Sequence, residues 1–355
     1  EDITEEKRQE EQVAFLTIHD QLTGLKNRRF FDDLMQKTNV EDVFPISFMM
    51  LDLNGLKLIN DAFGHLEGDK AILQVASAIM AHKRAEDIAI RLSGDEFIVF
   101  FMKTDKKIAQ NIGQHIQQTL EAQKETPFKI SVSWGVGMTE SKEDSILDIF
   151  KRAEDAMYKR KLLESSSMHN ATIQVIMDAL FDKSVIEQLH AESVKRISLL
   201  FGNILQLTST QLKELELAAY MHDIGKTSLD VKLLHKEQPI TENEIEILHK
   251  HPVIGYRILS STNMHTNIAR FILSHHEHFD GSGYPKGLQA EEIPLEARII
   301  AIVEAYDMMS RTLPYRKALS KKEIINDLTK QKNKQFDGRL VDIFIEGIVK
   351  KELTH

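Results

Sequence analysis

Apolar residues follow different periods in the two halves of this chain. Before residue 164, short apolar runs of strand character alternate with segments of helical period. The run at 44–53 is almost continuously apolar and ends in an acid, as a buried strand would. Other strand-like runs lie at 88–102, a hairpin with Ser93 to Glu96 at its tip, and at 129–137, while helical segments lie at 108–121 and 146–163. This alternation predicts an α/β domain.

From Met168 onward nearly every segment has the 3.6-residue period of a helix, which predicts an all-α second half. The change lies near the polar run 164–167, although the flanking patterns also fit one continuous connecting helix. We expect an N-terminal signalling or dimerisation helix at 1–19, a first domain at 20–163, a helical linker at 164–189 and a second domain at 190–355. Residues 1–19 fit a plain capping helix equally well.

Composition limits the classes to which the protein can belong. Its 355 residues, 42% hydrophobic and 28% charged, are enough for two domains that each have a core. The net charge of −9 argues against binding of a nucleic-acid polymer, whose backbone is held by clustered Lys and Arg, but leaves a small nucleotide open as ligand. Since there is no cysteine, a metal would have to use His, Asp or Glu.

No apolar stretch has membrane-spanning length and no signal peptide is recognisable, which predicts a cytoplasmic protein with no membrane segment in this chain. The first residue is Glu1 rather than Met. We therefore expect a fragment that lacks an upstream sensor domain, through which the full-length protein could be tethered to a membrane.

Imidazole and carboxylate side chains recur through the second half of the chain. The set is His190, His222, Asp223, His251, His275, His276 and Glu304. These ligand types hold borderline divalent metals, and several helices would be needed to bring them together. An isolated His-Asp pair is commonplace, but with this company His222 and Asp223 can share a metal, and the carboxylate can bridge two ions. The set predicts a helical metallophosphohydrolase.

Carboxylates also gather in the first half, where Asp52 ends a predicted strand and Asp95-Glu96 lies at the hairpin tip. Three such groups would suit Mg²⁺ that bridges nucleotide phosphates, although turns are rich in acids for purely local reasons. Residues 20–163 resemble the GGDEF family of diguanylate cyclases, which condense two GTP into cyclic di-GMP. The resemblance is carried by Asp20 to Arg28, Asp52 to Asp61, Gly64-His65, Gly68-Asp69 and the loop Ser93-Gly94-Asp95-Glu96-Phe97.

The GGDEF resemblance implies a central, mainly antiparallel sheet with flanking helices, and a site for GTP with Mg²⁺. It implies metal contacts from Asp52, the Leu53 carbonyl and Asp95, GTP contacts from Lys57, Asn60, Asp69, Glu96 and Lys161, and an inhibitory product site at Arg84 and Asp87. On spacing alone, Arg84 and Asp87 fit a surface i,i+3 ion pair. Ser93 replaces a family glycine, and Glu164-Ser165-Ser166 stand where the family keeps Gly-Arg-Asn, so a phosphate-binding cation is missing.

Residues 186–350 resemble the HD-GYP family, metal-dependent phosphodiesterases that open cyclic di-GMP. The resemblance is carried by His222 to Lys226, His251-Pro252, His275 to Leu288 with its Gly283-Tyr284-Pro285, Ile293-Pro294, Ala297-Arg298-Ile299 and Gln335-Phe336-Asp337. It implies two divalent transition metals, with iron or manganese expected, and the ligands His190, His222, Asp223, His251, His275, His276 and Glu304, the last of which is usually Asp. The glutamate that binds a third metal in some members is Ile186 here, and the neighbouring Glu187 would point about 100° away around a helix. Two metals are therefore expected, and a third metal held by Glu187 is the less favoured alternative.

The same resemblance implies that His222, Asp223 and Lys226 are catalytic, with Lys226 neutralising phosphoryl oxygens. It implies that Gly283, Tyr284, Pro285, Lys286 and Arg316 contact cyclic di-GMP, Tyr284 by stacking on guanine and Lys286 by meeting phosphate. Leu313 stands where the family has Arg, although Arg311 lies nearby, and Asp307 matches an acid expected to support the ligands. We infer no role for His235, His249, His265 or His278.

These implications predict a phosphodiesterase that converts cyclic di-GMP to pGpG, GMP or both, coupled to a GGDEF-like domain that binds GTP and synthesises cyclic di-GMP or only regulates. The alternative is a non-catalytic receptor of cyclic di-GMP or GTP that signals through a rearranged dimer. A homodimer is expected because synthesis needs two GTP held face to face. Reciprocal control through the helices at 146–189 would prevent a futile cycle.

Overall fold

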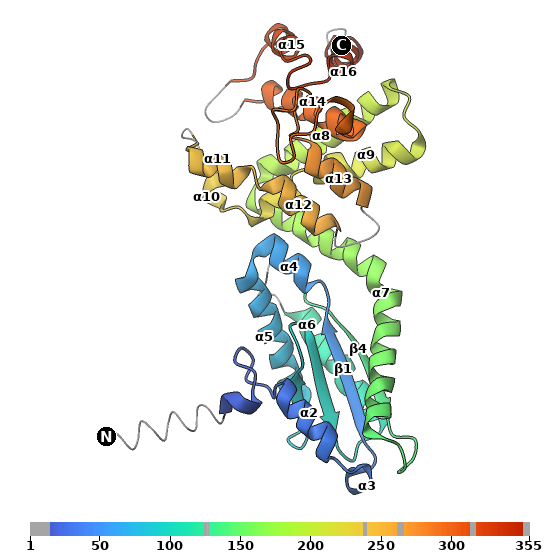
Figure 1. The fold of residues 1–355 in the computed structure, drawn as a ribbon. Helices are drawn as coiled ribbons and strands as arrows, with labels where there is room; N and C mark the ends of the chain where they lie inside the picture. Colours follow the sequence, from blue (N-terminus) through green and yellow to red (C-terminus); the bar gives the residue numbers. More distant parts are fainter. Residues whose placement is uncertain are drawn as a thin grey trace, which may run out of the picture. The chain divides into compact units, whose positions relative to one another are not determined.

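The computed structural model describes residues 15–123, 126, 128–236, 240–260, 266–312 and 317–350, with the backbone alone described at 162–171. The chain divides into two compact units, Glu1–Thr172 and Ile173–His355 (Figure 1). Of the predicted N-terminal helix at 1–19, residues 15–18 are helical and residues 1–14 lie outside the described part.

The first unit is built on a four-stranded sheet of order β2-β3-β1-β4, in which every neighbouring pair is antiparallel. Its strands are β1 (Ser47–Leu53), β2 (Ile88–Arg91), β3 (Glu96–Phe101) and β4 (Val132–Met138). Its helices are α2 (Arg28–Lys37), α3 (Val40–Val43), α4 (Leu56–Phe63), α5 (His65–His82), α6 (Lys106–Ala122) and the first part of α7 (Ile146–Lys183). The expected α/β architecture with a central antiparallel sheet is confirmed.

Helices cover both faces of this sheet because its strands are apolar on both sides. Phe48 and Met50 of β1 share a core with Ile149 and Ala153 of α7, whereas the intervening Met49 faces α6. Two glycines in β4 allow α7 to lie directly on the sheet: a Cβ at Gly135 would come within 2.1 Å of a backbone nitrogen of α7. The buried strand predicted at 44–53 is therefore buried on both faces.

The segment between the two units is continuous helix. The sequence also fitted a break near 164–167, but α7 runs unbroken from Ile146 to Lys183 and the division into units falls within it, after Thr172. The alternative of one connecting helix is confirmed, whereas the predicted limits of the linker, 164–189, stay a prediction.

The second unit is helical, as expected, and in its described residues the only β-type contact is an isolated bridge between Lys332 and Phe336. Its elements after α7 are α8 (Val185–Ile204), α9 (Ser209–Met221), η1 (Ile224–Ser228), α10 (Val231–Leu234), α11 (Glu242–Leu248), α12 (His251–Ser260), α13 (Thr266–Ser274), η3 (Ala290–Glu292), α14 (Leu295–Ser310), α15 (Lys321–Lys330), α16 (Gly338–Phe344) and η4 (Ile345–Val349). Within the described ranges of the chain, no helix is both long enough and apolar enough to cross a membrane.

Candidate active site

Helix ends in the second unit bring the predicted metal ligands together. His190 lies on α8 and Glu304 on α14, whereas the other ligands lie at helix boundaries. His222 and Asp223 join α9 to η1, His251 opens α12, and His275 and His276 follow α13. His276 and Glu304 are half-buried and the remaining ligands are buried. Five separate segments of the chain thus supply one cluster.

Each buried histidine of the cluster has one ring nitrogen that is hydrogen-bonded to another group of the protein. Nδ1 of His222, His251 and His275 lies 2.8, 2.6 and 2.5 Å from the carbonyl oxygen three residues earlier. Since a carbonyl can only accept, each of these Nδ1 atoms carries a proton. Nδ1 of His190 lies 2.6 Å from the Asp307 carboxylate. In all four rings Nε2 remains as the atom that can bind a cation.

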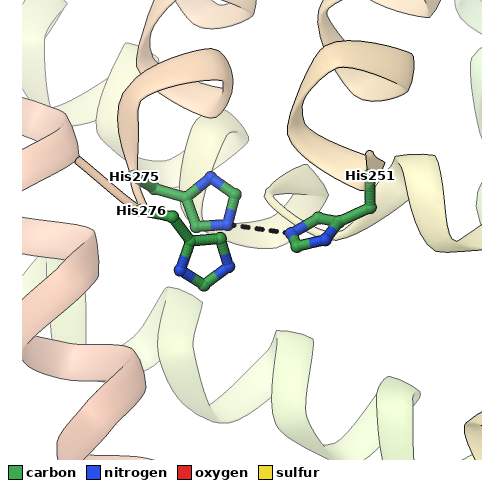
Figure 2. A group of neighbouring side chains, drawn as sticks. All are labelled: His251, His275 and His276. Atoms are coloured by element: carbon green, nitrogen blue, oxygen red, sulfur yellow. Dashed lines mark hydrogen bonds between the residues drawn. The ribbon is translucent and has the colours of Figure 1, made fainter. Parts of the chain in front are cut away.

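These Nε2 atoms face each other in pairs. The Nε2 atoms of His190 and His222 are 3.3 Å apart, and those of His251 and His275 are also 3.3 Å apart. Figure 2 shows the second pair, with the ring of His276 beside it. Two neutral rings would point lone pairs at each other at this distance, which only a shared proton or a cation between them relieves.

Asp223 lies between the two histidine pairs. Its Oδ1 is 3.3 Å from Nε2 of His251, and its Oδ2 is 3.1 Å from Nε2 of His222 and 4.0 Å from Nε2 of His190. Both oxygens are buried, and neither makes a hydrogen bond of acceptable geometry with any described residue. A buried carboxylate whose two oxygens face imidazole nitrogens on either side fits the role of a ligand shared by two metals.

Three imidazoles of the cluster are held in the neutral form that binds a metal. Burial lowers the pKa of His251 to about 3 and also lowers the pKa values of His275 and His276, which keeps these rings neutral. For His222, burial acts in the same direction, but Asp223 outweighs it and raises the pKa to about 9, so a proton and a cation compete for that Nε2. Burial opposes ionisation of Asp223, yet Lys226 and His222 hold its pKa well below the usual range.

The ligands form two sets, each compact enough to hold one cation. His251, His275 and His276 make one set, and His190, His222 and Glu304 make the other, with ligand atoms within 4.8 Å of one another in each set. Imidazole and carboxylate donors without thiolate suit manganese, iron, cobalt, nickel or zinc. With Asp223 between them, the residues fit two divalent transition metals, and Glu304 supplies the carboxylate of the second set.

A glycine allows the His-Asp segment to approach α12. A Cβ on Gly225 would lie 2.0 Å from the carbonyl oxygen of His251, so only glycine permits this contact. Because η1 follows Asp223 directly, the contact also sets the distance between Asp223 and His251.

The Gly-Tyr-Pro loop is fixed to the segment that carries His275 and His276. The buried carboxylate of Glu277 accepts the backbone N–H groups of Lys286 at 2.7 Å and Leu288 at 3.0 Å. A Cβ on Gly283 would come within 2.1 Å of the backbone nitrogen of His278, so this glycine also permits a close backbone approach. Glu277 and Gly283 therefore set the path of the loop beside the ligands.

Tyr284 packs against imidazole rings. Its ring stacks on His249 at 3.9 Å between centroids and on the ligand His276 at 5.0 Å, with interplanar angles of 19° and 22°. Pro285 and the side chain of Lys286 are exposed. Stacking of Tyr284 on guanine stays a prediction, because the observed partners of the ring are the two histidines.

A cavity of about 120 Å³ opens beside the ligands. It is lined by His275, His276, Glu277, His278, Ala301, Glu304, Ala305, Met308 and Gln335. Because His276 and Glu304, one from each ligand set, line it, a substrate in this cavity would touch both sets.

The first unit places its predicted metal residues at neighbouring strand ends. Asp52 of β1 lies opposite Glu96 of β3, and the N–H of Leu53 donates to the carbonyl of Asp95 at 2.9 Å. Oδ1 of Asp52 is buried without a hydrogen bond to a described residue, and Oδ2 is 2.7 Å from Nζ of Lys161. Burial raises the pKa of Asp52 although Lys161 opposes the shift. An orphaned carboxylate oxygen beside two other acids fits a divalent cation.

The substituted loop position Ser93 takes part in the loop itself. Its hydroxyl donates to Oε2 of Glu96 at 2.7 Å, and the guanidinium of Arg91 donates to the Gly94 carbonyl at 2.9 Å. The side chain that replaces glycine therefore contacts an acid predicted to lie beside the triphosphate.

The predicted guanine contacts come from consecutive helices. Asn60 on α4 lies against α5, because a Cβ on Gly68 would be 1.9 Å from the Asn60 amide oxygen. Asp69 follows Gly68 on α5 and is exposed, as is Lys57 on α4. A shared contact of Asn60 and Asp69 with guanine stays a prediction.

Arg84 and Asp87 form more than a surface pair. The guanidinium donates to both oxygens of Asp87, at 2.7 and 3.1 Å, and to the Met102 carbonyl at 3.2 Å. The Asp87 side chain is 0% exposed and that of Arg84 33% exposed. The carboxylate holds the guanidinium in one orientation; its use as an inhibitory product site stays a prediction.

Comparison with known families assigns the two units. The family model described as "Diguanylate cyclase, GGDEF domain" matches residues 17–167, and the one described as "HD domain" matches residues 174–340. The chain carries a GGDEF domain followed by an HD domain.

Similar proteins include both phosphodiesterases and diguanylate cyclases. The cyclic di-GMP phosphodiesterase response regulator RpfG of Xanthomonas campestris is 37% identical over 158 residues, which are 44% of this chain and 42% of that protein. The diguanylate cyclase DgcM of Escherichia coli is 32% identical over 164 residues, 45% of this chain and 40% of that protein. The coiled coil and GGDEF domain of DgcB from Caulobacter crescentus is 26% identical, covers 45% of this chain and 88% of that one, and has a TM-score of 0.41. The chain thus spans less than half the length of these two curated relatives.

Three residues of the HD domain lie at the site although the sequence assigned them no role there. Glu187, expected to point away, contacts Lys226; His249 stacks on Tyr284; and Glu277 holds the loop. Glu277 had a sequence signal in its place directly after the paired histidines, and Glu187 had one in its place beside Ile186. Arg311 lies on Asp307, with two contacts at 2.5 and 3.1 Å, while Leu313 and Arg316 fall outside the described residues.

Proposed function

We propose that the HD domain is a metal-dependent phosphodiesterase that hydrolyses cyclic di-GMP to pGpG, GMP or both. The observation that carries this proposal is Asp223, whose buried oxygens face histidine nitrogens of both ligand sets. Iron or manganese is the expected metal, held by His190, His222, Asp223, His251, His275, His276 and Glu304. Relatives named as cyclic di-GMP phosphodiesterases support the choice of substrate.

In the proposed reaction the side chains of this domain bind the metals, orient the ligand rings and neutralise charge on the phosphate. Two divalent ions, when bound, would supply an acidified water and charge neutralisation at phosphorus. The Nδ1 hydrogen bonds keep each imidazole in the orientation that turns Nε2 toward the centre. The Lys226 ammonium, 2.7 Å from Asp223, supplies a fixed positive charge for the phosphoryl oxygens as their charge grows.

Substrate contacts are proposed around the same cluster. Gly283 to Lys286 would border the substrate, with Tyr284 and Lys286 meeting base and phosphate, and Arg316 would meet a second phosphate oxygen. The position of this loop against the ligands, fixed by Glu277, supports that role.

For the GGDEF domain we propose that GTP binds with Mg²⁺ between β1 and the β2–β3 loop. Asp52, the Leu53 carbonyl and Asp95 would hold the metal, while Lys57, Asn60, Asp69, Glu96 and Lys161 would contact GTP. The orphaned Oδ1 of Asp52 supports a cation there. Synthesis would need two such domains to hold two GTP face to face, so a homodimer belongs to the proposal.

The test is chromatography of products after metal-reconstituted protein is incubated with cyclic di-GMP. We expect pGpG or GMP from the wild type and none from His222→Ala or Asp223→Ala, while His235→Ala, an exposed histidine outside both ligand sets, retains activity. Binding of cyclic di-GMP without turnover in Mn²⁺ or Fe²⁺ would contradict the enzyme and favour the receptor. The same incubation with GTP alone shows whether the domain that carries Ser93 makes cyclic di-GMP.

A further inference from the structure

Glu187 of the HD domain is engaged at the edge of the ligand cluster. It lies in the first turn of α8, where Ser184 caps the helix, and both its oxygens approach Nζ of Lys226, at 3.2 and 3.3 Å. The two side chains are only 14% and 18% exposed. An ion pair this shielded from water is screened little by salt and holds its partners in place.

Lys226 lies between two carboxylates of different kinds. Its Nζ is 2.7 Å from Oδ2 of Asp223, the proposed shared metal ligand, and 3.2 Å from Oε2 of Glu187, which belongs to neither ligand set. In the described part of the chain these two acids make the ion pairs of Lys226. Lys226 is therefore held by one acid inside the cluster and one outside it.

Metal binding would change the balance between these two contacts. Divalent cations bound to Asp223 would compete with Lys226 for the same carboxylate. They would also repel the Lys226 ammonium, because like charges a few ångströms apart in a buried site repel strongly. The ion pair between Lys226 and Glu187 would not be weakened by this competition. Glu187 is then the group that keeps Lys226 beside the cluster.

We propose that Glu187 is a positioning residue that holds Lys226 toward the substrate phosphate while the metals occupy Asp223. The inference rests on the proposed phosphodiesterase function, since it assigns Lys226 a role in hydrolysis. It also assigns Glu187 a role other than that of a third metal ligand, because its carboxylate is already paired with an ammonium.

The decisive variant is Glu187→Gln, which keeps size and removes charge. We expect kcat for cyclic di-GMP to fall about 10–100-fold, the usual effect of removing a partner that orients a site residue. KM should stay within about twofold, because Lys226 acts on charge that develops in the transition state. Metal content, measured by mass spectrometry of the purified protein, should equal that of the wild type. The matched control is Glu192→Gln, which removes an exposed glutamate of the same helix.

A double-mutant cycle separates positioning from a merely structural role. If Glu187 acts through Lys226, Glu187→Gln should have little further effect in a Lys226→Ala background. Additive losses, an unchanged kcat in the single variant, or a loss of bound metal would each overturn the inference.

Failure of the underlying function would be visible separately. If the wild type binds cyclic di-GMP without hydrolysing it, the same cycle is measured on the dissociation constant by calorimetry of the metal-loaded protein. Non-additive losses of affinity would support the positioning role even then, whereas additive losses would overturn it.

Discussion

At the scale of single residues, the chemistry of the HD domain depends on which ring nitrogen of each histidine is hydrogen-bonded within the protein and which is left to bind a metal. The backbone fixes Nδ1 of His222, His251 and His275 through the carbonyl three residues earlier. That leaves Nε2 as the ligand atom without help from other side chains. His190 differs because it lies within a helix, where its own carbonyls are used, and it relies on Asp307.

Because a side chain orients His190, a substitution of Asp307 can test this support. Asp307→Asn should weaken metal binding by about 10–100-fold. A neutral amide gives His190 a weaker hydrogen bond than a carboxylate does, and it does not neutralise the charge of Arg311. Competition against a chelator of known affinity measures the loss. Asp342→Asn, which removes an exposed carboxylate paired with Lys332, serves as the control. Equal metal affinity in the two variants would show that the His190 contact is not a support.

The residues that sequence reasoning missed share a physical cause. Ligand types at their spacing are visible in a sequence, so His222 to Lys226 and the paired histidines were predictable. The contact of Glu187 with Lys226 was not predictable, because it depends on how α8 packs against η1. From its position in the helix, one residue after Ile186, the Glu187 side chain was expected to point away from the metal ligands. The stacking of His249 on Tyr284 likewise joins segments far apart in the chain.

At the scale of elements, periodicity predicted the type of each segment better than its ends. The hairpin at 88–102 is present as β2 and β3, and the helix at 108–121 is α6 with small extensions. The continuity of α7 could not be decided, because the polar residues 164–167 suit an exposed helix as well as a linker. Close approaches at glycine were also hidden, since a glycine does not reveal which backbone lies opposite it.

Gly135 of β4 tests such an approach in the GGDEF domain. Gly135→Ala would place a Cβ 2.1 Å from the Met157 nitrogen, so α7 must move off the sheet, and we expect a loss of about 1–3 kcal/mol or more. Gly94→Ala is the matched control, because a Cβ there meets nothing within 4 Å. Urea unfolding followed by circular dichroism compares the two. A stable Gly135→Ala protein would mean that α7 does not lie against β4 as described.

Gly283 tests the loop of the HD domain. Gly283→Ala would set a Cβ 2.1 Å from the His278 nitrogen, so the loop must leave the path that Glu277 gives it. We expect hydrolysis of cyclic di-GMP to fall while metal content stays unchanged, since no ligand belongs to the loop. The exposed Glu291→Ala is the control. Loss of metal together with activity would instead mean that the loop maintains the ligand cluster.

At the scale of the whole molecule, one chain carries a domain type that makes cyclic di-GMP and one proposed to destroy it. If synthesis and hydrolysis of cyclic di-GMP ran at the same time, GTP would be consumed without a change in the level of cyclic di-GMP. Control between the domains is therefore expected. The unbroken α7 belongs to both units and ends at Lys183. There the Lys183 ammonium donates to the Thr227 carbonyl of η1 at 2.5 Å, one residue after Lys226. The helix that leaves the GGDEF domain thus contacts the segment that carries Lys226.

We therefore predict that GTP changes the rate of cyclic di-GMP hydrolysis, and that Lys183→Gln removes this response. The half-buried ammonium, whose pKa is lowered by desolvation, contacts η1 directly, so its loss should separate η1 from movements of α7. Initial rates with and without saturating GTP measure the response, in the wild type, Lys183→Gln and the control Asp178→Asn on an exposed face of α7. An unchanged wild-type rate at saturating GTP would refute control between the domains. A response that survives in Lys183→Gln would place the coupling elsewhere than at the end of α7.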